Sequence, residues 1–224
     1  MKKTIMMVFL LCTIVFAQQK GTFTDPRDKK TYKTVKIGEQ TWMAQNLDYH
    51  GEDGFFGLCY GDEPKKKRKP KLNCKNYGRL YDWKEAMEAC PAGWHLPSNK
   101  EWQILVDFAG GDKVAGKKLK SKSGWAKYDF SGKNPMFKKC KFEIIDDRGR
   151  VTGIEDYCAT DEYGFSAFPG YVKGITGNWW SATENGDDAD RAYGWGTSYQ
   201  HIDLRRAPYF KSPILLLSVR CLQD

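Results

Sequence analysis

The sequence predicts an α+β domain in which two helices pack on short antiparallel strands, with long glycine- and aromatic-rich loops and disulfides that staple the chain. Three observations support this prediction. Two segments carry apolar residues at helical spacing. Most of the remaining chain is divided by 22 glycines and is rich in aromatic residues, at 14% of the whole. Six of the seven cysteines follow a leader-like N-terminus. The share of hydrophobic residues, 41%, excludes a disordered or collagenous chain.

The N-terminus has the pattern of a secretory signal peptide. Two lysines precede an apolar run from Ile5 to Phe16, and Ala17 stands at a position that a signal peptidase inspects. The run is shorter than the about 20 residues that span a bilayer as a helix. A lipoprotein signal needs a small residue before its cysteine, and the large Leu11 precedes Cys12. We expect cleavage near Ala17 and a chain that is secreted or held on the outer surface of a bacterium, without a transmembrane segment.

Three regions follow from this pattern. Residues 1–17 are the expected signal peptide, residues 18–30 a polar, extended lead-in, and residues 31–224 a single domain. Inside that domain, Thr31–Ile37 alternates in polarity, and Gly38-Glu39 separates it from Gln40–Ala44. This spacing predicts two short antiparallel strands joined by a two-residue turn.

Two helices are expected next. Between Tyr81 and Cys90, the apolar residues fall at i, i+3, i+4 and i+7, which is one face of a helix. Ser98 and Glu101 have the spacing of a capping box, so a second helix begins there. Its apolar stripe continues to Ala109, where two glycines end it. The later apolar run from Ile214 to Val219 predicts a buried strand near the C-terminus.

An exported chain with an even number of cysteines favours disulfides. Six remain once the leader is removed, at positions Cys59, Cys74, Cys90, Cys140, Cys158 and Cys221. Six cysteines allow 15 pairings, and their spacing leaves the choice open. The chain contains no CxxC motif and only three histidines. A cysteine-based zinc site is therefore not expected.

The basic charge is concentrated in one segment. The net charge is +8, and it falls to +6 when Lys2 and Lys3 leave with the signal peptide. Residues 65–71 supply six of the positive charges. A nucleic-acid site would spread such residues over a groove, so we expect no nucleic-acid partner. A solvated loop is the expected structure here, with attachment to an acidic cell-surface polymer or to phospholipid head groups as the alternative.

A series of short motifs runs in order along nearly all of the mature chain. They are TVKIG at 34–38, WMAQNL at 42–47, CY at 59–60, YGRLYDW at 77–83, CPAGWHLP at 90–97, EW at 101–102, GFSA at 164–167, WWSATE at 179–184 and SVRC at 218–221. This series resembles the Fibrobacter succinogenes major paralogous domain, a family of exported bacterial proteins. The segment at 126–163 is longer than the family pattern and carries its own pair of cysteines.

A wider resemblance concerns the fold. A helix, Cys90, a WHL motif, Glu101, a late tryptophan strand and Cys221 are similar to the C-type lectin-like fold. This resemblance implies that Cys90 pairs with Cys221, which leaves Cys59–Cys74 and Cys140–Cys158 as local loops. It also implies a non-enzymatic binding module for a polysaccharide or a surface protein in adhesion. A structural component of a surface layer is the alternative.

Calcium chemistry does not transfer with this resemblance. Lectins of that fold chelate calcium around a proline and beside the late tryptophan. Here Lys133 precedes Asn134-Pro135, and Trp180 is followed by Ser181 rather than by an Asn-Asp pair. Hard oxygen ligands do occur nearby, at Glu184, Asn185, Asp187, Asp188 and Asp190. We expect a solvated acidic loop there and no cofactor, and keep the cluster as a weak calcium candidate.

We expect no enzyme. The chain contains no HExxH, no GxSxG and no glycine-rich phosphate loop. His95 lies between apolar residues and is expected to be a hydrogen-bonded packing residue. Formylglycine-generating enzymes share a similar Leu-Pro followed by Glu-Trp, but they need reactive cysteines, which three disulfides would consume. A glycosidase-type carboxylate pair remains an alternative, because only the folded chain decides the separation of two carboxylates.

Aromatic side chains are the remaining candidates for binding. Trp179 and Trp180 are adjacent in an expected strand, so they point to opposite faces and one of them is expected to be exposed. Aromatic faces stack on sugar rings and anchor interfaces. We therefore expect an exposed platform made of Trp180, Tyr193, Trp195 and Tyr199.

Overall fold

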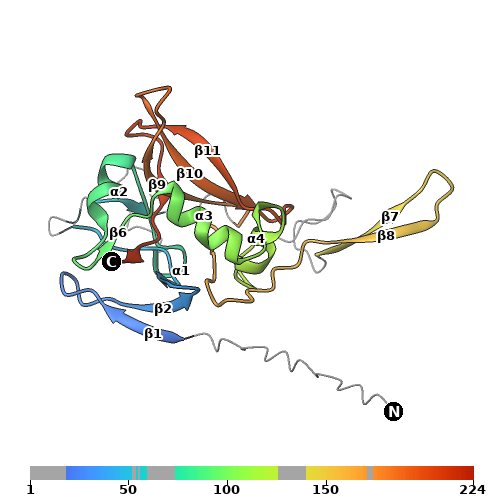
Figure 1. Cartoon of the computed structure of the whole chain (residues 1–224), viewed down its shortest axis with the longest axis horizontal. Helices are drawn as coiled ribbons and strands as arrows, with labels where there is room; N and C mark the ends of the chain where they lie inside the picture. Colours follow the sequence, from blue (N-terminus) through green and yellow to red (C-terminus); the bar gives the residue numbers. More distant parts are fainter. Residues whose placement is uncertain (1–18, 52–53, 55, 60–73, 126–139, 171–173) are drawn as a thin grey trace, which may run out of the picture.

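The computed structural model of the 224-residue chain describes residues 19–51, 54, 56–59, 74–125, 140–170 and 174–224 (Figure 1). The expected signal peptide, the lysine-rich segment at 65–71 and the Lys133–Pro135 motif lie outside the described residues. Within the described part, no helix is long and apolar enough to cross a membrane.

The described residues form a mostly β architecture. They contain thirteen strands in three sheets, and the longest of four short helices has ten residues. The expected α+β class of C-type lectin-like type is therefore wrong. The error has a physical cause, because the glycine- and aromatic-rich segments of the C-terminal half pair with one another over their whole length, where only a strand at the tryptophan pair and long loops were expected. They form the three longest neighbouring strands of the C-terminal half.

The first sheet contains the N-terminal hairpin and the C-terminal strand. Its order is β1-β2-β3-β13-β6, with β1 at Lys20–Thr24, β2 at Thr31–Ile37, β3 at Gln40–Met43, β13 at Leu222–Gln223 and β6 at Trp94–His95. The β2–β3 hairpin confirms the prediction, with Val35 opposite Trp42 and a left-handed Gly38 in the turn. Strand β1 lies in the region expected to be a lead-in, where it pairs with β2.

The second sheet has six strands in the order β11-β10-β9-β12-β5-β4. These are β11 at Arg205–Phe210, β10 at Arg191–Ser198, β9 at Thr176–Glu184, β12 at Leu217–Ser218, β5 at Arg79–Tyr81 and β4 at Leu58–Cys59. The expected strand from Ile214 to Val219 is thus formed only at Leu217–Ser218, which pairs with β5 and β9.

Four short helices cover these sheets. They are α1 at Cys74–Tyr77, α2 at Trp83–Ala89, α3 at Asn99–Phe108 and α4 at Asp112–Leu119. The two expected helices are present as α2 and α3, each begun by a capping box, at Asp82 and at Ser98. Helix α4 was not expected, because its lysine-rich sequence has few apolar residues.

Two hydrophobic cores lie on the two sides of the long strands. Trp42 and Trp179 belong to one core, which contains the buried face of α3. Their neighbours Met43 and Trp180 belong to the other, which contains buried residues of α2. Because successive strand residues point to opposite faces, β3 and β9 are covered on both sides. Trp102 links the aromatic residues of the first core, since its ring centroid lies 4.9 Å from that of Trp42.

Three disulfides join Cys59 to Cys74, Cys90 to Cys221 and Cys140 to Cys158. These are the pairs that the resemblance to the C-type lectin-like fold implied. The bond from Cys90, just after α2, closes a loop of 131 residues. A loop of this length stabilises the fold by about 4–5 kcal/mol through the unfolded chain.

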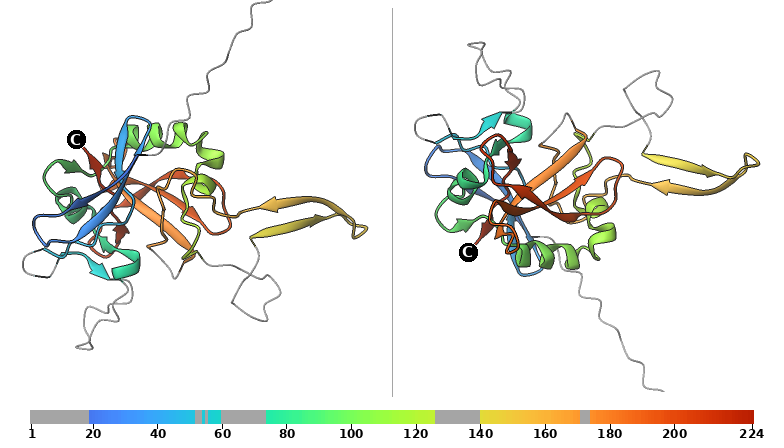
Figure 2. Two further views of the ribbon diagram at one scale, coloured as in Figure 1. Left: turned by 90° about the horizontal axis from the view of Figure 1, so that it is seen from below. Right: turned by 90° about the horizontal axis from the view of Figure 1, so that it is seen from above.

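The third sheet is a separate hairpin of β7 at Lys141–Ile145 and β8 at Val151–Asp156. It projects from the rest of the molecule in each view, drawn in yellow (Figures 1 and 2). We call residues 140–158, which are closed at the base by Cys140–Cys158, the arm.

Candidate functional site

The four aromatic residues expected to form an exposed platform do not form one. The exposed fractions of Trp180 and Trp195 are 0% and 2%, and Tyr193 and Tyr199 are half-buried. The reason is that both faces of β9 and β10 are covered, so that opposite-pointing tryptophans reach two different cores. The indole N–H groups are used internally: Trp180 donates to the carbonyl of Tyr81 at 2.8 Å.

The acidic cluster lies at the end of β9 and in the turn to β10, and two of its carboxylates form ion pairs. Glu184 lies 3.0 Å from the ammonium group of Lys211, and Asp188 lies 3.1 Å from the guanidinium of Arg191. The carboxamide oxygen of Asn185 accepts a hydrogen bond from the backbone N–H of Asp187. No group of three acidic, histidine or cysteine side chains in the described residues is placed to hold a metal ion.

His95 joins the C-terminus to the start of α3. Its Nδ1 lies 2.6 Å from a carboxylate oxygen of Asp224, and its Nε2 lies 3.0 Å from one of Glu101. Partial burial lowers the pKa of His95, but these hydrogen bonds and charges outweigh burial and raise it above the ordinary value. The imidazole is thus hydrogen-bonded, as expected, and both ring nitrogens are occupied by structural partners.

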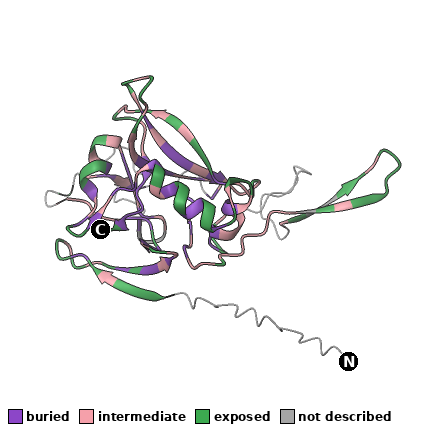
Figure 3. Cartoon of the chain, in the orientation of Figure 1, coloured by how far each residue is buried: buried purple, intermediate pink, exposed green. Residues whose placement is uncertain are grey.

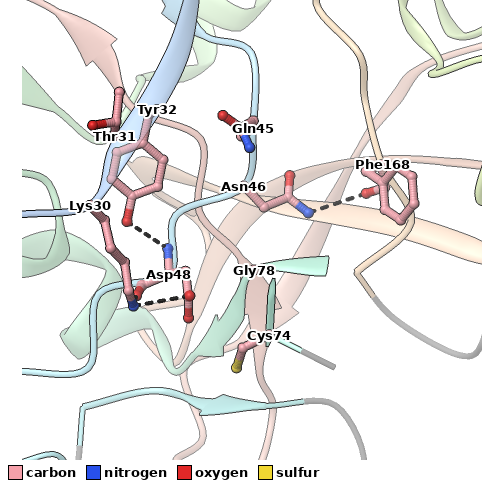
Figure 4. Close-up of a pocket in the computed structure, with 9 residues that line it drawn as sticks. All are labelled: Lys30, Thr31, Tyr32, Gln45, Asn46, Asp48, Cys74, Gly78 and Phe168. Atoms are coloured by element: carbon pink, nitrogen blue, oxygen red, sulfur yellow. Dashed lines mark hydrogen bonds and ion pairs between the residues drawn. The ribbon is translucent and has the colours of Figure 1, made fainter. Parts of the chain in front are cut away.

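A pocket of about 360 Å³ opens beside the β2–β3 hairpin (Figure 4). It lies where the chain enters β2, leaves β3 and passes from α1 to β5. Its lining residues are Lys30, Thr31, Tyr32, Gln45, Asn46, Asp48, Cys74, Gly78 and Phe168. The volume falls in the range of small-molecule sites, about 300–1,000 Å³. We take this pocket as the candidate functional site.

The floor of the pocket requires a glycine. Gly78 has a φ of +74°, and a Cβ atom built there would lie 2.6 Å from the Cβ of Asn46 and 2.8 Å from the carbonyl oxygen of Leu47. The N–H of Arg79 donates to that same carbonyl at 2.8 Å. The close approach of these two backbone segments brings Asp48 and Arg79 together at one end of the pocket.

The charges at this end alternate in sign. The ammonium group of Lys30 lies 3.0 Å from the carboxylate of Asp48 and 3.5 Å from that of Asp28. Arg79 places its Nε 3.2 Å from the other oxygen of Asp48. Two cations and two carboxylates thus form a chain of zero net charge. Lys30 remains 35% exposed, so a ligand can reach it.

Asn46 forms the pocket wall and is fully hydrogen-bonded. Its Nδ2 donates to the carbonyls of Tyr77 and Phe168, at 2.9 Å and 3.2 Å. Its Oδ1 accepts from the indole of Trp179 at 2.8 Å and from the guanidinium of Arg220 at 2.9 Å. Asn46 therefore links the pocket to the protein interior and has no free group for a ligand.

Arg220 lies in the interior behind this wall and is completely buried. Burial lowers its pKa to about 9, against the opposing charge of Asp161. The guanidinium also donates to the carbonyls of Phe165 and Met43, at 2.7 Å and 3.1 Å. A buried cation held by neutral oxygens fixes the segments that carry them, and the back of the pocket is rigid for this reason.

Other lining groups remain available. The Nε2 of Gln45 makes no hydrogen bond in the described part of the chain, while its Oε1 accepts from the N–H of Lys33 at 2.7 Å. The hydroxyl of Tyr32 accepts from the N–H of Asp48 at 3.1 Å, and burial raises its pKa, so it keeps its proton. In Figure 4, Lys30, Tyr32 and Asp48 lie on one side and the half-buried Phe168 on the other.

Sequence reasoning noted the motif at 42–47 only as a mark of family. A local signal was present, because the polar residues Gln45, Asn46 and Asp48 directly follow the buried strand β3. Phe168 carried no such signal. It reaches the pocket only through the fold, where its ring centroid lies 5.1 Å from that of Tyr77.

Comparison with known proteins gave one match. Residues 35–223 match the family model described as the Fibrobacter succinogenes major domain. Neither the curated proteins nor the solved structures contained a match.

Proposed function

Since the chain belongs to the Fibrobacter succinogenes major domain family, we propose that it is a non-enzymatic extracellular module that binds a polysaccharide and holds one neutral sugar unit in the pocket beside Lys30. The three disulfides support the compartment, because such bonds persist in oxidising surroundings outside the cytoplasm. The proposal replaces the expected tryptophan platform with a site made of polar groups and one aromatic ring.

The composition of the pocket carries this proposal. Sugar hydroxyls both donate and accept hydrogen bonds, and the pocket offers a carboxylate, an ammonium group, a free amide donor and a phenol. The ring of Phe168 provides an apolar face for the C–H groups of a sugar. Because the charges of Asp28, Lys30, Asp48 and Arg79 cancel, the site favours a neutral sugar over an acidic one.

The same geometry argues for binding without turnover. Glycoside hydrolysis uses two carboxyl groups on either side of the bond, one of them protonated. Asp48 is the only carboxylate among the nine described lining residues. It forms ion pairs with Lys30 and Arg79. No second carboxylate among the described residues lines the pocket to complete such a pair.

The test is retention of the purified mature chain on insoluble cellulose, xylan and bacterial cell-wall fractions, with released sugar assayed in the same tubes. Lys30→Met removes the charged donor and keeps the aliphatic stem. We expect it to weaken binding about tenfold or more, since a hydrogen bond from a charged group contributes about 1.5–3 kcal/mol. Gln45→Ala should weaken binding about two- to tenfold.

Lys36→Met is the matched control. Lys36 lies on β2, outside the pocket lining, and pairs with the exposed Glu39. Retention should be unchanged in this variant, and it should persist in the presence of a chelator. Retention that is equal in all three variants, or absent on every polymer, would refute the pocket as the site. Released sugar would refute the non-enzymatic part of the proposal.

A further inference from the structure

Strand β11, at the edge of the second sheet, has one face that the rest of the described chain leaves open. Three of its residues point to this face, and they are Arg206, Pro208 and Phe210. In the antiparallel register they stand opposite three residues of β10, in the order Trp195, Tyr193 and Arg191. Because directly opposed residues and every second residue of a strand point to the same side, all six share one face.

Helix α3 covers only one end of this face. Trp195 is 2% exposed and belongs to the core that contains the buried residues of α3. The other end of β10 and β11 extends past α3 towards the turn at 185–190 (Figure 1). None of the six residues of β11 is buried (Figure 3), and Phe210 is 53% exposed. We call the exposed residues Arg206, Pro208 and Phe210 the β11 face.

Two guanidinium groups lie over aromatic rings on this side of the sheet. The Cζ of Arg191 lies 4.1 Å from the ring centroid of Phe210, and that of Arg206 lies 4.8 Å from the ring centroid of Tyr193. Arg191 also forms an ion pair with Asp188 at 3.1 Å. Arg206 makes neither an ion pair nor a side-chain hydrogen bond with any described residue. The Tyr193 ring therefore orients the guanidinium of Arg206 while its N–H donors stay free.

A free guanidinium and a neighbouring apolar surface define the chemistry of a ligand. The planar guanidinium can give two parallel hydrogen bonds to one carboxylate. Pro208 and Phe210 follow Arg206 on the same face at about 7 Å and 13 Å, because a strand rises about 3.3 Å per residue. Arg191 covers one side of the Phe210 ring, yet the ring remains half exposed. Such a ring can take the C–H face of a sugar.

We propose that the β11 face binds an acidic polysaccharide, whose sugar rings carry carboxylate groups, and that Arg206 is the residue that binds a carboxylate. The pocket beside Lys30 differs in its chemistry, because its own charges cancel. The β11 face is a second site with a second ligand class, and this proposal does not depend on what the pocket binds.

The charges around Arg206 allow an anionic ligand to approach. Asp203 precedes β11 and is paired with Arg205 at 2.7 Å. Asp187 and Asp190 lie in the turn before β10, at the Phe210 end of the face. They are about 13 Å or more from Arg206 along the strands. This separation exceeds the screening length of about 8 Å at physiological ionic strength.

Isothermal titration calorimetry of the purified mature chain, with its disulfides intact and a chelator present, tests this proposal. The probes are soluble polygalacturonate, its neutral methyl ester and poly-glutamate. The first two share their sugar chain and differ in charge, whereas poly-glutamate carries carboxylates without sugar rings. We expect polygalacturonate to bind at least about tenfold more tightly than the ester. It should also bind at least about threefold more tightly than poly-glutamate, because only the sugar polymer can use the Phe210 ring.

Variants assign the binding to named groups. Arg206→Gln should weaken the binding of polygalacturonate at least about tenfold. Arg206→Lys keeps the charge but lacks the planar pair of donors, so it should recover only part of this loss. Phe210→Ala should weaken binding about two- to tenfold. Arg148→Gln is the matched control, because Arg148 is an exposed arginine of the arm without an ion pair in the described residues. It should bind polygalacturonate as the wild type does.

Several results would overturn the proposal. Equal affinity for polygalacturonate and its methyl ester, or no binding of polygalacturonate, would show that no carboxylate is recognised. A loss in Arg148→Gln as large as that in Arg206→Gln would show a general effect of net charge. Poly-glutamate binding as tightly as polygalacturonate would show that the face binds any acidic chain, including an acidic peptide. Retention on neutral cellulose tests the pocket and enters none of these comparisons.

Discussion

The hydrogen bonds of Asn46 provide the sharpest test of how this fold supports its pocket. We expect Asn46→Ala to lower the free energy of unfolding by about 3–5 kcal/mol. Asn46 is 6% exposed and makes four strong hydrogen bonds, two as donor and two as acceptor. Alanine removes all four, and the buried indole of Trp179 and guanidinium of Arg220 lose this acceptor.

The magnitude follows from those partners. The bond from Arg220 is charged and fully buried, so its loss costs about 1.5–3 kcal/mol, and the indole of Trp179 adds about 1 kcal/mol. Phe168 lines the pocket and Tyr77 directly precedes the lining residue Gly78, so their carbonyls regain water in part and contribute about 1 kcal/mol together.

Urea unfolding followed by tryptophan fluorescence, with the disulfides intact, measures the effect. A loss of this size lowers the midpoint by about 1–2 M urea. Gln45→Ala removes a carboxamide at the adjacent, exposed position and should cost less than about 1 kcal/mol. Asn46→Asp keeps an acceptor for Arg220 and places a charge beside it, so it should lose less than Asn46→Ala. A midpoint for Asn46→Ala equal to that of Gln45→Ala would refute the reasoning.

Three further predictions concern other parts of the fold. The pKa of His95 is raised in the folded protein, so its ion pairs stabilise the fold at pH values below 6.5, the ordinary pKa of histidine. This contribution is about 0.5 kcal/mol at a partly exposed site. It is lost as the pH rises through the pKa of His95 in the folded protein. The urea midpoint of His95→Gln should therefore vary less with pH in this range than the midpoint of the wild type. Equal pH dependence of the two midpoints would contradict the prediction. Gly116→Ala should cost about 2 kcal/mol or more of unfolding free energy, because its Cβ would lie 2.0 Å from the carbonyl oxygen of Asp203, whereas Gly186→Ala, with no atom within 4 Å, should unfold as the wild type does. Replacing Cys140 and Cys158 by serine should accelerate amide exchange in the arm and leave the global midpoint nearly unchanged, because neither cysteine belongs to a core; a large global shift would contradict this.

Local sequence determined the helix starts and the first hairpin. The side chains of Ser98 and Glu101 each accept a hydrogen bond from the backbone N–H of the other residue, so the start of α3 depends on residues only three positions apart. The two glycines after α3 and the short turn at Gly38 are local in the same way. The family could also be read from short motifs, and the resemblance supplied the disulfide pairing. None of these features depends on what packs against them.

The burial of the tryptophans and the position of the pocket were decided only by the tertiary structure. An alternating strand looks the same in sequence whether one face or both are covered, so Trp180 and Trp195 could not be recognised as core residues. Lys30 and Phe168 line the same pocket although they are 138 positions apart in the sequence. Gly78 permits the close approach of its own segment to Asn46 and Leu47 at the pocket floor. Such a site depends on the order of the strands, which is set by the combined burial of many side chains and not by any local pattern.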